Sequence, residues 1–328
     1  MNSYGSRVRC EDGMFRITSG DDLQLLSPFK VTRLLLASSC SLSTDAIALA
    51  MEHGIELVLI KRNGHAYGRI WDFSYGSTAE LRRAQAMFPY FPEAGIWIKG
   101  ILLSKVKAQI SLLKHFVHRR PAHSVLIIES TSQLEMMAQR LADSDPKKFV
   151  READQVRGFE GYSSKVYFNA LTALVPAGWY LGVRSRRPAK DKFNCALNYL
   201  YGILYGRLEG IVINHGLDPA MGFLHRLEHN RPSLVLDLIE PYRPWADQQA
   251  VKLCQGNLLS DDHFDFEEEG VLLNEAGRKL VIPLFNEYMN EVVQYQGMRR
   301  SRYNQMHVGC TKLTQVLKEL NLDSLFFQ

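Results

Sequence analysis

The sequence is poor in cysteine, and the few cysteines that it has form no recognisable pattern. Five cysteines occur among 328 residues, at positions 10, 40, 195, 254 and 310, and no two of them form a CxxC pair. An odd number of scattered cysteines argues against both a disulfide framework and a zinc knuckle. We therefore expect reduced thiols in the core or at the surface.

Long apolar runs are missing as well. No stretch of the chain approaches the roughly 18 consecutive apolar residues that a membrane-spanning helix needs. The first ten residues, MNSYGSRVRC, contain no apolar segment of the kind found in a secretory signal. We therefore expect a cytoplasmic protein without a membrane partner.

The signature motifs of several enzyme classes are also absent. The sequence has no GxGxxG after a predicted strand, no Walker GxxxxGK[ST], no HExxH and no GxSxG. Dinucleotide redox chemistry, nucleotide hydrolysis, zinc-protease chemistry and serine-hydrolase chemistry each depend on one of these motifs. The sequence therefore gives no support to any of the four.

The length of the chain and its apolar content suit two domains. The chain has 328 residues, and 46% of them are hydrophobic. This is more apolar chain than a single ordinary hydrophobic core contains. Residues 1–75 hold short apolar segments separated by turns such as Asn63-Gly64, and a helix over residues 44–53 that Ser43 would cap. This pattern predicts a small β-rich domain.

The rest of the chain has a different character. Residues 76–95 combine small polar residues with paired arginines and prolines, and we interpret them as a linker. From residue 96 onward apolar residues recur at helical spacing, for example Ile98, Leu102 and Val106. We predict an α+β protein in which the β-rich domain is followed by a larger all-α domain, residues 96–328, that carries the functional site.

Positive charge is concentrated in a few segments although the whole chain is only mildly basic. The formal net charge is +4, and the basic clusters are Arg82-Arg83 and residues 114–120, 184–192 and 298–302. Such clusters can neutralise the phosphates of a nucleic acid, although a solvated helix face is the commoner meaning of any one of them.

The stretch from residue 198 to residue 244 contains an unusual pair of acids. Asp237 lies in the run Ser-Leu-Val-Leu-Asp-Leu-Ile, which should be buried. Carboxylates are almost never fully buried without a partner such as a cation. Asp237 and Glu240 would share a helical face, unless Pro241 ends the helix between them.

A third acid, Glu160, lies between two glycines in Arg-Gly-Phe-Glu-Gly, residues 157–161. Glycines on both sides would let a ligand or another chain approach the carboxylate closely. The alternative is a helix that tolerates two glycines and exposes a surface glutamate.

These acids and a histidine could hold a divalent cation. In a nucleic-acid enzyme such a cation needs anionic oxygen ligands and open positions, and Glu160, Glu240 and His225 could supply an incomplete shell. Because imidazole suits manganese better than magnesium, we expect activity with Mn²⁺ as well as Mg²⁺. A structural histidine remains the alternative for His225, and His215 and His229 are competing candidates.

Taken together, the motifs resemble those of the universal CRISPR-associated endonuclease and integrase of the adaptation stage. The matching segments are Arg157-Gly-Phe-Glu-Gly161, Tyr167-Phe168, Arg184-x-Arg-Arg-Pro-x-x-Asp191-x-x-Asn194-x-x-Leu-x-Tyr199, Gly216-Leu-Asp-Pro219, Gly222-Phe-Leu-His225 and Arg231-Pro-Ser-Leu-x-x-Asp237-Leu-x-Glu240-x-x-Arg243-Pro244. Further matches, at Leu42-Ser43-Thr44, Gly54-Ile55 and Gly68-Arg69, extend the resemblance over nearly the whole chain.

The resemblance implies a fold and a site. The fold would be an N-terminal β-sandwich followed by an α-helical domain. The metal ligands would be Glu160, His225 and Glu240, with Asp237 supporting the site as a further catalytic residue. Some members of that family carry aspartate at the last ligand position, which leaves the division of roles between Asp237 and Glu240 open.

The resemblance also implies a reaction and partners. In metal-dependent transesterification, the 3′-hydroxyl of a captured foreign DNA fragment attacks a phosphodiester at the leader end of a repeat array, as part of antiviral defence. With water as the nucleophile, the same site is an endonuclease. The expected partners are double-stranded DNA, a second copy of the chain and a small ferredoxin-like adaptation protein, with residues 1–75 contributing to the protein contacts.

Two basic segments are the candidates for contacts with the DNA backbone, which position DNA without reading its sequence. Their residues are Arg184, Arg186, Arg187, Lys190 and Lys192 in one segment and Arg82 and Arg83 in the other. Two other functions remain open at this point: a structure-directed nuclease acting in DNA repair, and a catalytically idle DNA-binding scaffold.

Overall fold

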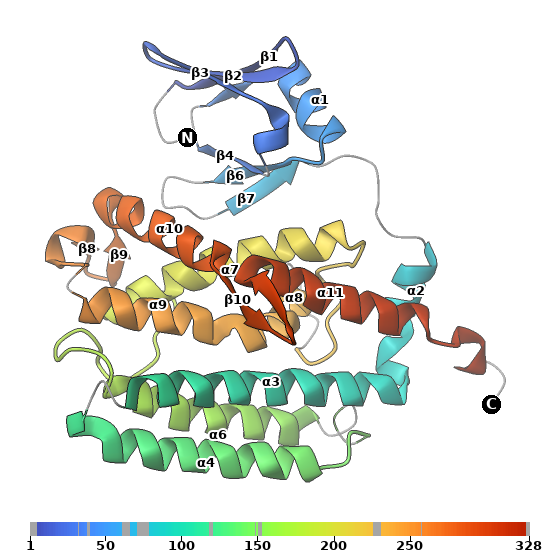
Figure 1. Cartoon of the computed structure of the whole chain (residues 1–328), viewed down its shortest axis with the longest axis vertical. Coiled ribbons are helices and arrows are strands. Elements are labelled where there is room, and N and C mark those ends of the chain that lie inside the picture. Colours follow the sequence, from blue (N-terminus) through green and yellow to red (C-terminus); the bar gives the residue numbers. More distant parts are fainter. Residues whose placement is uncertain are drawn as a thin grey trace. The chain divides into compact units, whose positions relative to one another are not determined.

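The chain forms two compact units. The computed structural model describes residues 5–31, 33–37, 40–60, 66–70, 79–117, 121–147, 149, 153–225, 231–256 and 258–325. The units are Met1–Gly76 and Ser77–Gln328, and Figure 1 labels their elements. Across the described residues, no helix has the length and apolar character needed to cross a membrane.

The first unit consists of strands and a short helix. The four-stranded sheet has the order β3-β2-β1-β5, and the three-stranded sheet has the order β4-β6-β7. The elements are β1 (Arg7–Glu11), β2 (Met14–Ser19), β3 (Asp22–Leu26), η1 (Pro28–Lys30), β4 (Arg33–Ala37), β5 (Ser41–Leu42), α1 (Thr44–Glu52), β6 (Glu56–Ile60) and β7 (Ala66–Ile70).

Both sheets and α1 share one core. Alternating residues of the strands, such as Val8 and Leu57, are buried in it together with Ala46 of α1. The helix begins as predicted, because the Ser43 hydroxyl accepts a hydrogen bond from the Ala46 backbone N–H at 3.2 Å. The predicted Asn63-Gly64 turn lies outside the described residues, but the flanking β6 and β7 pair antiparallel.

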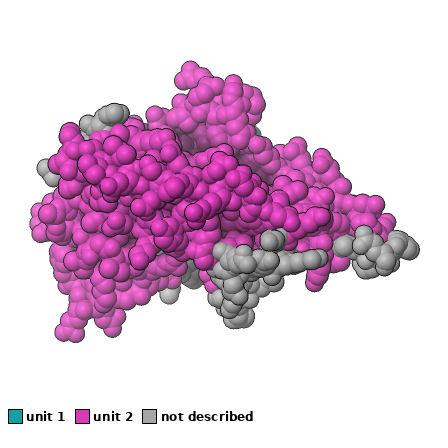
Figure 2. Space-filling model, turned by 90° about the horizontal axis from the view of Figure 1, so that it is seen from below, with its two compact units in different colours: residues 1–76 teal, residues 77–328 magenta. Residues whose placement is uncertain are grey.

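The second unit, coloured magenta in Figure 2, is mainly helical. Its helices and turns are α2 (Ala79–Met87), η2 (Phe88–Tyr90), α3 (Pro92–Val117), η3 (Pro121–His123), α4 (Ser124–Asp143), α6 (Ala153–Thr172), α7 (Lys192–Asn214), α8 (Ser233–Leu238), η4 (Glu240–Tyr242), α9 (Arg243–Gln255), η5 (Asp261–His263), α10 (Glu275–Asn290), α11 (Arg302–Lys318) and η6 (Leu322–Leu325).

The α+β class predicted from the sequence is confirmed, with one correction to its second part. That part is not all-α, because two short antiparallel ribbons interrupt the helices. Their strands are β8 (Phe264–Phe266), β9 (Val271–Leu273), β10 (Val292–Tyr295) and β11 (Met298–Ser301). Each strand of these ribbons has only three or four residues. In so short a segment, the alternation of apolar and polar residues that marks a strand cannot be told from the sequence of a loop.

The segment that we interpreted as a linker contains an element of the second unit. Residues 79–87 form α2, in which Leu81, Ala84 and Gln85 are buried. The Ser, Gly and Thr residues suggested a break, but burial of one face is what stabilises a short helix in a protein.

Helix α3 lies at the centre of the second unit. It packs against α4 and α6 on one side, and it contacts α9 and η4 on another (Figure 1). The predicted helical spacing holds, since Ile98, Leu102 and Val106 are buried. Lys105 is also buried, although lysine rarely is. The contact between α3 and η4 brings this lysine to the segment that begins with Glu240.

Candidate metal centre

The loop that carries His225 is held in place from several sides. The buried amide of Gln85 in α2 donates hydrogen bonds to the carbonyls of Asp218 (2.8 Å) and Met221 (2.9 Å). At Gly222 a Cβ atom would lie 2.6 Å from the carbonyl carbon of Ser233, so only glycine fits between the loop and the start of α8.

An aromatic cluster anchors the same loop close to the histidine. The ring of Phe223 meets the rings of Phe88 and Trp97 edge to face, with centroids 4.8 and 5.4 Å apart. Such pairs add to the stability that burial alone provides. The backbone immediately before His225 is therefore fixed by packing as well as by hydrogen bonds.

Asp237 orients the histidine. Its carboxylate is fully buried and accepts hydrogen bonds from the backbone N–H groups of Phe223, Leu224 and His225. Its Oδ1 atom also lies 2.6 Å from His225 Nδ1. With Nδ1 carrying the proton toward Asp237, the lone pair of Nε2 faces away from Asp237, the arrangement found behind metal-bound histidines.

Glu160 lies in a helix that tolerates both neighbouring glycines, which is the alternative that its sequence left open. It belongs to α6, and its side chain is 23% exposed. The neighbouring glycines are tolerated within the helix, and a Cβ atom at Gly158 or Gly161 would meet nothing within 4 Å. The packing of the described protein therefore does not require glycine at either position, and the space beside Glu160 is open.

Glu240 begins η4, directly after α8, and its side chain is 1% exposed. Helix α8 ends at Leu238, so Asp237 and Glu240 do not share one continuous α-helix. The proline at position 241 accounts for this, because it disfavours the α-helical conformation of the residue before it. The two acids consequently point to different partners.

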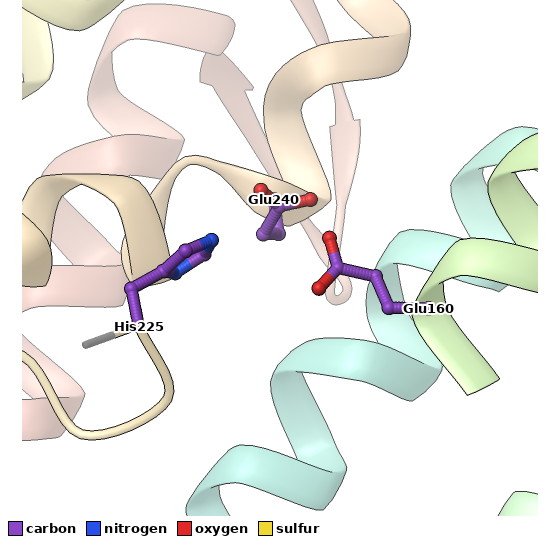
Figure 3. Close-up of side chains that lie close together, drawn as sticks. All are labelled: Glu160, His225 and Glu240. Carbon is purple, nitrogen blue, oxygen red and sulfur yellow. The ribbon is translucent and has the colours of Figure 1, made fainter. Parts of the chain in front are cut away.

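Glu160, His225 and Glu240 come together although they are far apart in the sequence. Each offers a ligand atom, and these atoms lie within 4.8 Å of one another. Figure 3 shows the two carboxylates and the imidazole converging from three segments of the chain. Asp237 lies behind the histidine and is not one of the three.

Two basic residues that were not among the predicted site residues surround the acids. Lys105 Nζ lies 2.8 Å from Glu160 Oε1 and 2.6 Å from Glu240 Oε2, and Arg243 Nε lies 2.8 Å from Glu240 Oε1. Burial alone would raise the pKa of Glu240, but Arg243 and Lys105 outweigh it and lower the pKa from 4.5 to about 2. Glu240 is therefore an anion at neutral pH.

Of the competing histidines, the structure describes His215, which does not join the centre. His215 ends α7, where its ring contacts the Ile211 carbonyl at 2.9 Å and the Thr311 hydroxyl at 3.2 Å. His229 lies outside the described residues. His215 thus has a structural role at the end of α7.

The predicted DNA-contact residues of the basic loop have different environments. Arg186, Arg187 and Lys190 are exposed. Arg184 instead turns inward, where it donates hydrogen bonds to the side chains of Asn194 and Asn198. Its role is therefore to hold the loop against α7.

Lys192 and the arginine pair of α2 complete the predicted set. Lys192 Nζ lies 2.7 Å from Asp261 Oδ1 and 4.5 Å from the centroid of the Trp179 ring, so its charge already has protein partners. Arg82 and Arg83 are exposed on α2. The exposed part of the basic loop is thus smaller than the sequence suggested, and Lys190 Nζ in it also donates a hydrogen bond to the Glu269 carbonyl at 2.9 Å.

Comparison with known proteins identifies relatives along most of the chain. The family described as CRISPR associated protein Cas1 matches residues 1–287. The CRISPR-associated endonuclease Cas1 1 of Thermus thermophilus is 32% identical over 321 residues, which cover 97% of this chain and 95% of that protein.

Two solved structures share the fold at lower sequence identity. A casposase bound to integration product has a TM-score of 0.78 and 20% identity, over 97% of this chain and 89% of its own. A chain of a Cas6-RT-Cas1–Cas2 complex has a TM-score of 0.77 and 18% identity, over 97% of this chain and 34% of its own. The similarity in structure thus extends over both units.

Proposed function

The chain belongs to the Cas1 family of CRISPR-associated proteins, and from that premise we propose that Glu160, His225 and Glu240 hold the metal ion of its DNA chemistry. The resemblance seen in the sequence motifs is confirmed: the protein is a CRISPR-associated DNA endonuclease and integrase of the adaptation stage. The site assignment rests on the convergence of three ligand atoms within 4.8 Å.

The donor set fits a divalent cation. Two carboxylates supply anionic oxygen, and one imidazole offers a nitrogen whose ring is fixed by Asp237. Among the described residues, Glu240 Oε2 is one of three buried side-chain atoms that lack a directed hydrogen bond. Because the set mixes oxygen and nitrogen, it suits Mn²⁺, and its carboxylates also suit Mg²⁺. We expect activity with either ion.

The reaction is the transfer of a phosphodiester bond. The 3′-oxygen of a captured DNA fragment forms a bond to phosphorus at the leader end of a repeat, and the bond to the 3′-oxygen of the target strand breaks. When bound, the metal would polarise the phosphoryl oxygen and lower the pKa of the attacking hydroxyl. Asp237 holds the imidazole in one orientation and Arg243 holds Glu240, so the ligands are fixed before DNA binds.

Cleavage and joining differ only in the nucleophile. With water in place of the 3′-hydroxyl, the same attack cuts the strand, which accounts for endonuclease and integrase activity at one site. The proton of the attacking hydroxyl is lost as the new bond forms, and the leaving 3′-oxygen takes one up. No covalent intermediate with the protein is required.

DNA is the proposed macromolecular substrate, in the form of a protospacer fragment and a repeat with its leader. The exposed Arg186, Arg187 and Lys190, and the exposed arginines 82 and 83 of α2, are the candidates for contacts with phosphates. Arg184 and Lys192 belong to the scaffold of the basic loop, because their side chains are only partly exposed and bind Asn194, Asn198 and Asp261.

The proposed protein partners are a second copy of this chain and a small ferredoxin-like adaptation protein. Support for an adaptation partner comes from the structural relative that is part of a Cas1–Cas2 complex. We propose that the β-rich first unit contributes to these protein contacts, which leaves the helical unit for DNA.

A joining assay tests the site. The substrate is a branched DNA with a labelled fragment that ends in a 3′-hydroxyl, incubated with Mn²⁺ or Mg²⁺. We expect Glu160→Ala and His225→Ala to abolish strand joining while DNA binding, measured by fluorescence anisotropy, stays close to that of the wild type. Glu129→Ala and His123→Ala, which make the same changes at exposed positions, serve as matched controls and should join normally.

The same assay separates the alternative functions. Cutting without joining would favour the structure-directed nuclease acting in repair, and DNA binding without either reaction would favour the idle scaffold. Normal joining by both Glu160→Ala and His225→Ala would refute the assignment of the site.

A further inference from the structure

The ammonium group of Lys105 occupies the position between the two acids of the candidate metal centre. Its Nζ atom lies 2.8 Å from Glu160 Oε1 and 2.6 Å from Glu240 Oε2, and its side chain is 5% exposed. A magnesium ion bound to the same two oxygens would lie about 2.0–2.1 Å from each of them. The ion and the ammonium group would therefore compete for one small space.

Both oxygens of Glu240 already face cations. Oε1 accepts a hydrogen bond from Arg243 Nε at 2.8 Å, and Oε2 faces Lys105. The carboxylate is buried, so no solvent-facing oxygen is left over for a metal. A metal that takes the place of Lys105 Nζ beside Glu240 Oε2 requires that ammonium group to move away.

Arg243 is the cation that is better held. Its guanidinium group lies 5.1 Å from the centroid of the Tyr201 ring and 5.4 Å from that of the Tyr205 ring, in addition to its bond with Glu240. A planar guanidinium group in such a stack has a fixed orientation, whereas the lysine ammonium is a point charge at the end of a flexible stem. Lys105 is thus the group that can leave.

In the absence of a metal, Lys105 has a clear stabilising role. Two carboxylates that lie this close repel each other, and a buried charge without a partner is costly. The single ammonium group offsets the charge of Glu160 and Glu240 at once, and burial of the site strengthens the attraction.

We propose that Lys105 is an internal counter-ion, which holds the two carboxylates together in the metal-free protein and is displaced when the divalent cation binds. The proposal rests on the metal role of Glu160, His225 and Glu240 argued above. It makes Lys105 a positioning residue that sets the affinity of the site for metal. The site is then preassembled, at the cost of a competing positive charge.

Metal titration of the full-length protein without DNA tests this role. Free Mn²⁺ is measured by electron paramagnetic resonance in wild-type protein, in Lys105→Met and in Lys105→Gln. Because the substitutions remove a positive charge beside the ion, we expect Mn²⁺ to bind at least about fivefold more tightly. Lys107→Met, the same change at an exposed position of α3, is the matched control and should bind as the wild type does.

Thermal unfolding gives a second readout that is independent of activity. Without metal, the Lys105 variants should melt at a lower temperature than the wild type, because the carboxylates lose their counter-ion. Mn²⁺ should then raise their melting temperature by more than it raises that of the wild type. A variant that is unfolded without metal must refold when Mn²⁺ is added, and failure to refold would overturn the proposal.

The outcomes distinguish this inference from the assignment of the metal site. If the wild type binds Mn²⁺ in a manner that depends on Glu160 and His225, but the Lys105 variants bind it equally or more weakly, only the counter-ion proposal is refuted. If the wild type binds no Mn²⁺ at this site, the proposed metal centre itself is refuted.

Discussion

Glu240 and Asp247 are both buried acids of the helical unit, and their surroundings differ in one decisive respect. Glu240 faces Arg243 and Lys105, whereas Asp247 accepts hydrogen bonds from the hydroxyls of Tyr167 (2.7 Å) and Tyr201 (2.6 Å). The pKa of Glu240 is lowered to about 2. Burial raises the pKa of Asp247 to about 6, against the opposing effect of its hydrogen bonds.

The difference shows that burial of an acid does not by itself identify a metal ligand. Cationic neighbours keep Glu240 ionised and leave Oε2 without a directed hydrogen bond. The tyrosine hydroxyls give each oxygen of Asp247 a hydrogen bond, and Asp247 is not part of the group of described residues that could hold a metal ion. We therefore propose a chemical role for Glu240 and a structural role for Asp247, according to the groups that surround them.

The largest expected effect separates the two acids directly. Glu240→Gln should lower the rate of strand joining by at least about a hundredfold, because it removes an anionic ligand from the centre. Asp247→Asn should change that rate by less than about tenfold and should lower the free energy of unfolding by about 1–3 kcal/mol, as one hydrogen bond is weakened. Joining assays and urea unfolding of both variants measure the contrast. Equal losses of joining in the two variants would contradict the assignment of different roles to these acids.

A smaller effect is expected at Asp237, a third buried acid whose partners are N–H groups. Asp237→Asn should weaken Mn²⁺ binding by about ten- to a hundredfold, since the ring of His225 loses the acceptor that fixes it. Isothermal titration calorimetry measures the affinity, with Asp247→Asn as the control that should retain wild-type binding. Unchanged affinity in Asp237→Asn would show that packing alone orients the histidine.

The smallest effect is a difference in the pH dependence of stability. The pKa of Asp247 is raised from 3.8 to about 6, so the folded protein holds this proton more strongly than the unfolded chain does. The resulting stabilisation is fully present below pH 3.8 and is lost as the pH rises through about 6. The stability of the wild type relative to Asp247→Asn should therefore fall over this range, as measured by urea unfolding at each pH. A flat difference would contradict the raised pKa.

Much of the fold could be predicted because its local signals agree with its packing. Ser43 caps α1 in the structure as its residue type predicts. Helical spacing located α3. The ribbon β10–β11 was missed, because strands of four residues have no period that can be distinguished from a loop.

The candidate site was predicted in its acids and its histidine but not in its cations. Lys105 lies three residues after Leu102 and four before Gln109, so it falls on the face that the spacing predicts to be buried. A buried lysine requires an acidic partner, and this signal was available in the sequence. The sequence could not show which acid is the partner, because that depends on the packing of α3 against α6 and η4.

The segment around Glu160 had two interpretations in the sequence, an open approach to the carboxylate between glycines and a helix that tolerates both glycines. The structure has the helix, because the backbone continues as α6 through both glycines. A glycine in a helix costs about 1 kcal/mol relative to alanine, which the packing of a long helix can absorb. The sequence alone did not show that the carboxylate of this helix meets His225 and Glu240, because that depends on tertiary packing.

The hydrogen bonds from Gln85 to the carbonyls of Asp218 and Met221 have a consequence for how the protein folds. Gln85 and Met221, which it binds in the loop before His225, are 136 residues apart in the sequence. Lys105 and Glu160 are 55 residues apart. Contacts of such high sequence separation form late, because the entropy of closing long loops opposes them until the intervening chain is ordered. The candidate metal centre therefore depends on the completed helical unit, and we expect an incompletely folded or truncated chain to lack it.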